Sequence, residues 1–162
     1  AHIAFLDEVF KASSSILNAI LTLMNERRFH NGTEVHRAPL ISLFGAANEL
    51  PEDEELQALY DRFLVRFLVH YIDDDFRFLR MLQAPPAAAT TQLTLDDLAA
   101  LRAEAASLPI GDQVFRSLAE LRRSLNAKRI VASDRRYRQA VDVLRARAFL
   151  DGRAAVEESD LF

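Results

Sequence analysis

Two short apolar runs restrict the fold of this chain more than any other feature of its sequence. The first run, residues 2–6, ends at an Asp-Glu pair, and the second, residues 39–47, ends at an Asn-Glu pair. Uninterrupted apolar runs of this length are typical of strands buried on both faces of a parallel sheet. Between them, Leu, Ile and Met recur at helical spacing over residues 16–24, after three serines that can cap a helix. The pattern predicts a strand, a crossover helix and a second, parallel strand.

The crossover also contains a hairpin signal. Within residues 28–35, Asn31-Gly32 lies between alternating residues. This dipeptide favours the tight turn that joins two antiparallel strands. We therefore expect a β-hairpin inserted between the helix and the second strand.

A third apolar run and two acidic clusters follow the second strand. The acidic residues 52–55 begin a helix that continues through Leu59, and the apolar run 67–72 is a candidate third strand. An acidic triplet, residues 73–75, then opens a helix that ends near Gln83. Negative charge at the start of a helix is favourable because it lies at the positive end of the helix dipole.

The rest of the chain predicts helices only. Residues 84–94 carry no charge and no periodicity, which makes them the best candidate for a linker. Helical patterns cover residues 95–107, 112–126 and 134–150, and a further helix begins at Ser159. With only four Gly and five Pro, the composition favours an ordered, helix-rich chain.

The expected fold class is α/β followed by an all-α part, predominantly helical overall. Residues 1–83 form an α/β core with a partial parallel sheet and crossover helices, residues 84–94 a linker, and residues 95–162 a helical bundle.

Composition excludes several classes of protein. There is no cysteine, which removes disulfides, thiolate zinc sites and cysteine nucleophiles, and which permits a reducing compartment. The charge-free helical stretch 12–25 is too short to span a membrane, and no signal peptide opens the chain. Because the first residue is Ala1 and the sequence begins inside an apolar run, we expect this chain to be a piece of a longer protein.

Positive charge is concentrated in one window. The chain has 20 Lys and Arg against 24 Asp and Glu, a net charge of −4, yet residues 116–147 hold ten basic residues against three acidic ones. Such a surface favours an anionic partner such as phosphate or nucleic acid. The alternative for any one of these arginines is a solvated helix face.

The polar residues that close the first two runs can carry chemistry. Asp7 and Glu8 follow the first strand, where open α/β sheets bind their ligands. One carboxylate can hold Mg²⁺ through water while the other acts as a general base. Asn48, which follows the second strand, can orient a water and contact a phosphate, although Asn is also a common turn former. Strands that run parallel place all three at the same edge.

Two pairs of arginines are candidates for phosphate contacts. Arg62 and Arg66 precede the third run, where a guanidinium could stabilise a phosphoryl group of a neighbouring subunit; an ion pair with Asp61 or the preceding acidic stretch is the alternative. Arg135 and Arg136 lie in the first turn of a helix, after the capping residues 133 and 134. Positive charge there opposes the helix dipole, so a bound anion would offset its cost.

Other catalytic patterns are absent from the sequence. The four histidines, at positions 2, 30, 36 and 70, are too scattered for a metal-ligand cluster, and no His-Glu-x-x-His occurs. No Gly-x-Ser-x-Gly supports an acyl-transfer triad.

The order of several motifs carries a resemblance to a known family. The motifs are IAFLDEVFKA at 3–12, LMNER at 23–27, FHNG at 29–32, GAANE at 45–49, DRF at 61–63, SDRR at 133–136 and AFLDGR at 148–153. In this order they resemble the MoxR family of AAA+ ATPases, and most of all its RavA-like subgroup.

The resemblance assigns roles to the candidate residues. It implies that Asp7 and Glu8 are the Walker B pair, with Asp7 supporting Mg²⁺ and Glu8 activating water, and that Asn48 is the sensor 1 residue. Arg62 is the expected arginine finger, which reaches the next subunit's nucleotide, with Arg66 as the second choice.

The same resemblance extends to the helical part and to the partners. It makes residues 1–83 the C-terminal half of the AAA+ core and residues 95–162 the lid, in which Arg135 is the better candidate for sensor 2 and Arg136 remains possible. It further implies ATP and Mg²⁺ as cofactors, a cytoplasmic homo-oligomeric ring, most simply a hexamer, and ATP-driven remodelling or chaperone-like maturation of proteins. Proteins with von Willebrand factor A domains are expected partners.

One motif of the family is missing. No Gly-x-x-x-x-Gly-Lys-Ser/Thr occurs, so the phosphate cradle is absent and the chain alone is predicted to be inactive. In the family, the strand before this loop lies between the sensor 1 strand and the strand after the arginine finger, so its absence leaves unpaired backbone. Either the chain is truncated or another chain fills the gap.

Two alternative functions follow. The chain could be a non-catalytic protein-interaction module without its own nucleotide site, which the missing loop favours. Nucleic-acid binding by residues 116–147 is the other, but the acidic net charge and the lack of interleaved aromatic residues count against it.

Overall fold

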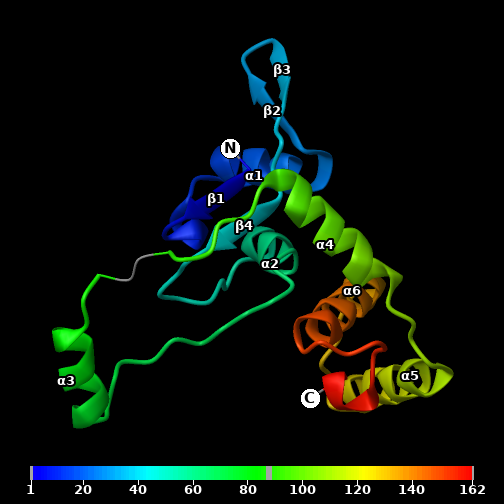
Figure 1. The fold of residues 1–162 in the computed structure, drawn as a ribbon. Helices are drawn as coiled ribbons and strands as arrows, with labels where there is room; N and C mark the ends of the chain where they lie inside the picture. The colour runs from blue at the N-terminus through cyan, green and yellow to red at the C-terminus, as the bar shows by residue number, and fades with distance from the viewer. Residues whose placement is uncertain (1, 87–88, 162) are drawn as a thin grey trace. The chain divides into compact units, whose positions relative to one another are not determined.

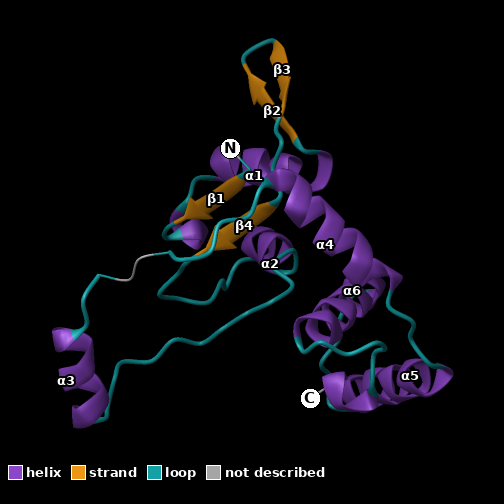
Figure 2. Cartoon of the chain, in the orientation of Figure 1, coloured by secondary structure: helices purple, strands orange, loops and turns teal. Residues whose placement is uncertain are grey.

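The computed structural model describes residues 2–86 and 89–161. The chain divides into two compact units, Ala1–Arg66 and Phe67–Phe162. The first contains strands and helices, and the second contains helices (Figures 1 and 2).

The predicted strand, crossover helix and parallel strand are confirmed. β1 (Ile3–Leu6) pairs in parallel with β4 (Ser42–Gly45), in a register that runs from Ile3 opposite Ser42 to Leu6 opposite Gly45. α1 (Ser14–Glu26) is the crossover helix, and Ser13 precedes it in extended conformation without a side-chain capping bond. The carboxyl ends of both strands therefore point the same way.

The predicted hairpin is also present. β2 (Arg28–Asn31) and β3 (Glu34–Arg37) pair antiparallel around a two-residue turn. Gly32 in this turn has a φ of 60°, a conformation that glycine adopts at no steric cost.

The core of the first unit lies on one side of the strand pair. The buried residues Val9, Leu17, Ile20 and Leu59 form it, and they come from the short 3₁₀ helix η1 (Val9–Lys11), α1 and α2 (Glu54–Tyr60). Phe63 packs so close to β4 that a Cβ atom on Gly45 would lie 2.8 Å from its ring. A side chain at Gly45 would displace Phe63 from this core.

Two expectations about strands are wrong. The strands are not buried on both faces, since Ile3 and Phe5 are 63% and 67% exposed. The run 67–72 forms no strand, and Phe67, Leu68 and Val69 are each more than 80% exposed. An apolar run becomes a strand only when a neighbouring backbone pairs with it, and the sheet of β1 and β4 has just two strands among the described residues.

The helix expected after the acidic triplet is present but unpacked. α3 (Asp75–Gln83) begins where the Asp74 carboxylate accepts a hydrogen bond from the Arg77 backbone N–H at 2.8 Å. None of the residues of α3 is buried. Its formation therefore reflects its cap and charge pattern rather than tertiary packing.

The helices of the second half are confirmed with close agreement at their ends. They are α4 (Leu95–Ser107), α5 (Asp112–Ala127) and α6 (Asp134–Leu150). The helix expected at Ser159 is the short 3₁₀ helix η2 (Glu158–Leu161). Of the predicted linker, residues 87–88 lie outside the described residues, and the rest has no helix or strand.

A small apolar core and a buried ion pair hold the second unit. Val114, Leu144, Ala148 and Val156 form the core. Beside it, the Arg153 guanidinium donates to both oxygens of Asp160, whose side chain is 1% exposed. These hydrogen bonds hold the pKa of Asp160 below its usual range, and they raise that of Arg153. No helix among the described residues has the length and apolar character to cross a bilayer.

Candidate functional site

The Asp-Glu pair lies at the carboxyl end of β1, in a turn that is strained. Glu8 has a φ of 49°, in the left-handed region that non-glycine residues avoid. Its backbone N–H donates to the Asp7 carboxylate at 2.9 Å, and the chain then enters η1. Backbone strain of this kind clusters at functional sites, where the surrounding structure maintains it.

Asn48 meets Glu8 across the strand pair. Its Nδ2 donates to Glu8 Oε1 at 2.7 Å. The backbone bonds from Ala46 N to Leu6 O (2.8 Å) and from Val9 N to Ala46 O (3.0 Å) continue the pairing beyond the strands. They bring the two strand ends together, which confirms the expected proximity of Glu8 and Asn48.

A residue that the sequence reasoning missed completes this cluster. Lys11 Nζ lies 3.2 Å from Glu8 Oε2, so each carboxylate oxygen of Glu8 has a partner. The signal was present in the sequence, because residues three apart on a helical turn can form an ion pair. Lys11 also lines a pocket of about 400 Å³ with Asp53 and five further residues of the first unit.

Arg62 and Arg66 are both held at the end of α2. Arg62 Nε donates to Asn25 Oδ1 at 3.1 Å, and its Nη1 donates to the Ala58 carbonyl. Arg66 donates to the Tyr60 and Phe63 carbonyls at 2.7 and 3.0 Å, and its guanidinium lies 3.5 Å from the Tyr60 ring centre. The structure thus places Arg62 against α1 and stacks Arg66 on an aromatic ring.

Arg135 and Arg136 belong to the second unit, in the first turn of α6. Ser133 caps this helix by accepting from the Arg136 backbone N–H at 3.4 Å. The neighbouring Asp134 lies 3.0 Å from Arg122 on α5. Asp134 supplies the negative charge that the helix dipole favours, so part of the predicted electrostatic cost is offset within the chain.

The side chains at the end of β1 suit magnesium but do not form a phosphate site. Mg²⁺ is commonly held by one or two carboxylates together with water and substrate phosphate, and Asp7 is an exposed carboxylate of this kind. The described residues contain no group of three or more His, Cys, Asp or Glu that could hold a metal ion. The residues fit the metal-supporting and water-activating half of a nucleotide site, and the chain lacks a Gly-x-x-x-x-Gly-Lys-Ser/Thr loop for the other half.

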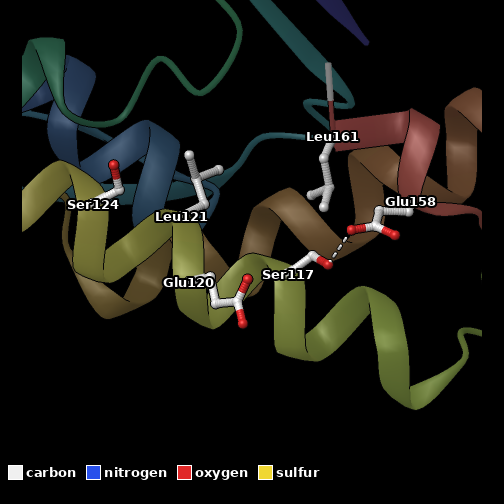
Figure 3. A pocket seen from close by; sticks show the side chains of 6 residues that line it. All are labelled: Ser117, Glu120, Leu121, Ser124, Glu158 and Leu161. Carbon is white, nitrogen blue, oxygen red and sulfur yellow. Dashed lines mark hydrogen bonds between the residues drawn. The ribbon is translucent and has the colours of Figure 1, made fainter.

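A second pocket is lined by residues of the second unit, and none of the candidate residues is among them. Figure 3 shows this cavity of about 250 Å³, lined by Ser117, Glu120, Leu121, Ser124, Glu158 and Leu161. The Ser117 hydroxyl donates to the Glu158 carboxylate and links α5 to η2. The pocket belongs to the packing of the second unit rather than to the chemistry proposed for Glu8.

Two known protein families match most of this chain. Residues 1–107 match the family described as the MoxR domain in the MoxR-vWA-beta-propeller ternary systems, and residues 113–162 match the AAA lid domain. The chain belongs to the MoxR family of AAA+ ATPases. The MoxR match includes β1, α1, the hairpin and β4, and the lid match includes α6 and η2.

Individual proteins are also similar to this chain in sequence or in structure. Two proteins of Methanocaldococcus jannaschii, both named uncharacterized (MJ0079 and MJ0812), are 41% and 42% identical over 162 residues. They match 99% of this chain, which spans 42% and 43% of their lengths. The crystal structure of "a putative ATPase" from Cytophaga hutchinsonii matches the fold with a TM-score of 0.74 at 20% identity, over 99% of this chain and 55% of that one.

Proposed function

We propose that this MoxR chain is the part of an AAA+ ATPase that activates water and carries the lid, in a protein that couples ATP hydrolysis to remodelling or chaperone-like maturation of partner proteins. The observation that carries the proposal is the contact between Asn48 Nδ2 and Glu8 Oε1 at 2.7 Å, beside Asp7, at the shared edge of two parallel strands. A carboxylate and an amide held side by side at this edge can both contact the same water, the carboxylate as an acceptor and the amide through its oxygen or its second N–H.

The chemistry of the first unit is divided among three side chains. Bound Mg²⁺ would supply charge stabilisation for the phosphates, and Asp7 is the residue to support it. Glu8 accepts a proton from the attacking water, and Asn48 orients that water. Asn48 and Lys11 each contact one oxygen of Glu8, and because a carboxylate oxygen can accept two hydrogen bonds, Glu8 keeps an acceptor site for the water.

Arginines of both units complete the proposal. Arg62 acts as the finger in the neighbouring subunit's site, with Arg66 as the second choice, and Arg135 acts as sensor 2, with Arg136 as the alternative. The chain is then divided into the C-terminal half of the AAA+ core over residues 1–83, a linker over 84–94 and the lid over 95–162. A homo-oligomeric ring, most simply a hexamer, follows from a finger that acts between subunits.

The partner proposal rests on the family. The description of the matching family names ternary systems of MoxR, vWA and β-propeller. This description supports a von Willebrand factor A domain protein as the partner. The RavA-like subgroup and action in the cytoplasm remain predictions from the sequence motifs.

The test is Glu8→Gln in a full-length protein that joins this chain to a phosphate-binding loop. The amide fills the same space but cannot accept a proton, so ATP binding is retained and turnover falls by about 10²-fold or more. Glu104→Gln, at an exposed position of α4, is the matched control and keeps normal turnover. Wild-type turnover in Glu8→Gln would remove Glu8 from the mechanism.

A second candidate is a non-catalytic interaction module. It is favoured by the absent phosphate-binding loop and by the exposed apolar run 67–72. Both proposals agree that the 162-residue chain alone hydrolyses no ATP, because the remaining residues address only the metal, the water and the outer phosphate. Titration calorimetry of the chain with Mg-ATP tests this point, and micromolar binding would contradict it.

A further inference from the structure

The β2–β3 hairpin presents a surface that the proposed ATPase chemistry does not use. All eight of its strand residues are exposed, and its packing is against the end of α1. In Figure 1 the hairpin extends away from the β1–β4 pair. It is a two-stranded ribbon without a core of its own, which is marginally stable in isolation.

Its register places two positive charges opposite each other. Arg28 lies opposite Arg37. The next pair along the two strands is Arg27 and Ala38, and it is hydrogen-bonded, because the Ala38 N–H donates to the Arg27 carbonyl at 2.8 Å. Because hydrogen-bonded and non-hydrogen-bonded pairs alternate, Arg28 and Arg37 form a non-hydrogen-bonded pair, in which side chains lie closest. Like charges directly opposite are destabilising. Neither arginine has an ion-pair partner among the described residues.

Val35 and Arg37 of β3 carry backbone groups with no partner among the described residues. In a non-hydrogen-bonded pair, the backbone N–H and C=O of each residue point away from the partner strand. Val35 and Arg37 therefore direct these groups outward along the free edge of β3, whereas β2 lies against α1. An exposed edge of this kind can accept another strand.

We propose that the free edge of β3 binds an extended acidic peptide segment of a partner protein. The segment adds as a third strand to the hairpin, and carboxylates at alternate positions lie on the face that carries Arg28 and Arg37. The only acidic residue of the hairpin strands, Glu34, lies on the opposite face and is 3.1 Å from His36. The binding face is therefore purely basic and apolar.

A peptide fits this edge better than a nucleic acid does. The outward N–H and C=O groups of Val35 and Arg37 need a partner that both donates and accepts at strand spacing, which a peptide backbone provides. The chain's net charge of −4 also disfavours a long polyanion, whose binding depends on many cationic contacts.

The test uses the 162-residue chain and a short labelled peptide of alternating Glu and Val. Fluorescence anisotropy measures binding to the wild type, to Arg28→Gln/Arg37→Gln and to Arg116→Gln, an exposed arginine of α5 that serves as the control. We expect the double variant to bind about tenfold more weakly, in line with the loss of two exposed charge pairs. The Arg116→Gln control should bind the acidic peptide as the wild type does. A second peptide, with Gln in place of Glu, should bind the wild type about as weakly as the acidic peptide binds the double variant.

Amide hydrogen exchange tests the added strand independently of charge. Peptide binding should protect the amides of Val35 and Arg37, which are outward-facing, and change that of His36 much less. Charge reversal gives a further check, because Arg28→Glu/Arg37→Glu should bind a peptide of alternating Lys and Val instead. Circular dichroism confirms that each variant is folded.

Three outcomes would overturn the proposal. Equal peptide binding by the double variant would show that these arginines are not the site. Tighter binding of a short single-stranded DNA, lost in the double variant, would assign the face to nucleic acid. Absence of peptide binding together with aggregation of the double variant would mean that the arginines only protect an open edge.

Discussion

At the scale of single residues, the chain separates side chains that hold the fold from side chains that could do chemistry. Leu59 is fully buried and belongs to the core of the first unit, whereas Glu8 lies in a strained turn and its carboxylate is bonded to Asn48 and Lys11. A buried leucine contributes through area and packing, and a strained carboxylate contributes little to stability. The two kinds of residue therefore predict different consequences of substitution.

Leu59→Ala should destabilise the first unit by about 2–5 kcal/mol, because it leaves a cavity among Val9, Leu17 and Ile20. The measurement is urea-induced unfolding followed by the amide NMR signals of β1 and β4. Leu68→Ala removes the same atoms from an exposed position and should change stability by less than about 0.5 kcal/mol. An equal effect of both substitutions would show that Leu59 is not in a packed core.

Asp160 predicts a pH dependence for the second unit. Its pKa is lowered chiefly by the hydrogen bonds from Arg153, so the charged form is stabilised in the folded state. This contribution is fully present above the usual pKa of an aspartate, near 4, and is lost as the pH falls through the lower folded-state value. Thermal unfolding of α6, followed between neutral and acidic pH, should show this loss.

Asp160→Asn should lower the unfolding midpoint at neutral pH and remove that part of the acid dependence. Glu104→Gln, at an exposed position of α4 beyond its first turn, is the control and should leave both nearly unchanged. If Asp160→Asn kept the full wild-type acid dependence, another group would be responsible.

At the scale of elements, the helices and strands differ in whether they can satisfy their own backbone hydrogen bonds. α4 satisfies its first turn locally, since Thr94 and Asp97 form a reciprocal capping box and the Thr94 hydrogen bonds lower the pKa of Asp97. β1 and β4 pair only with each other among the described residues. A helix satisfies its backbone internally, while a strand depends on its neighbours.

Hydrogen exchange should follow this difference. We expect little protection over residues 67–72, intermediate protection at Leu6 and Leu43, and the strongest protection at Val141 and Leu144 of α6. Stronger protection at Leu6 and Leu43 than in α6 would mean that the sheet is completed by a contact that this chain forms with another copy.

At the scale of the whole molecule, the proposed function needs more than one chain. We propose that one polypeptide carries both the water-activating residue and the arginine finger, and that the finger acts on a neighbouring subunit. The chain spans about two fifths of the length of the M. jannaschii relatives it matches. Activity is therefore a property to be measured in a full-length assembly.

Mixing two inactive variants of such a protein tests the finger in trans. Arg62→Ala subunits and Glu8→Gln subunits should together recover part of the wild-type ATPase rate, because one kind of interface then holds both intact groups. Arg77→Ala, at an exposed position of α3, should need no such rescue. Lack of recovery in mixed rings that still assemble would argue against Arg62 as the finger.

Local signals in the sequence were enough to predict several elements. The hairpin with its turn at Gly32, the helices of residues 95–150 and the strand–helix–strand unit were all predictable, because turn chemistry, caps and periodicity act over a few residues. The same reasoning placed Asp7, Glu8 and Asn48 at one sheet edge, since parallel strands share their carboxyl ends.

Only the tertiary structure decided which long-range contacts form. The run 67–72 has the composition of a strand but stays exposed. A strand forms only beside a neighbouring strand, and the composition of the run does not determine whether such a neighbour is present. The hydrogen bond from Asn48 to Glu8 and the burial of Asp160 against Arg153 also depend on how separate turns of the chain pack. Such contacts are set by three-dimensional geometry, in which residues far apart in sequence become neighbours.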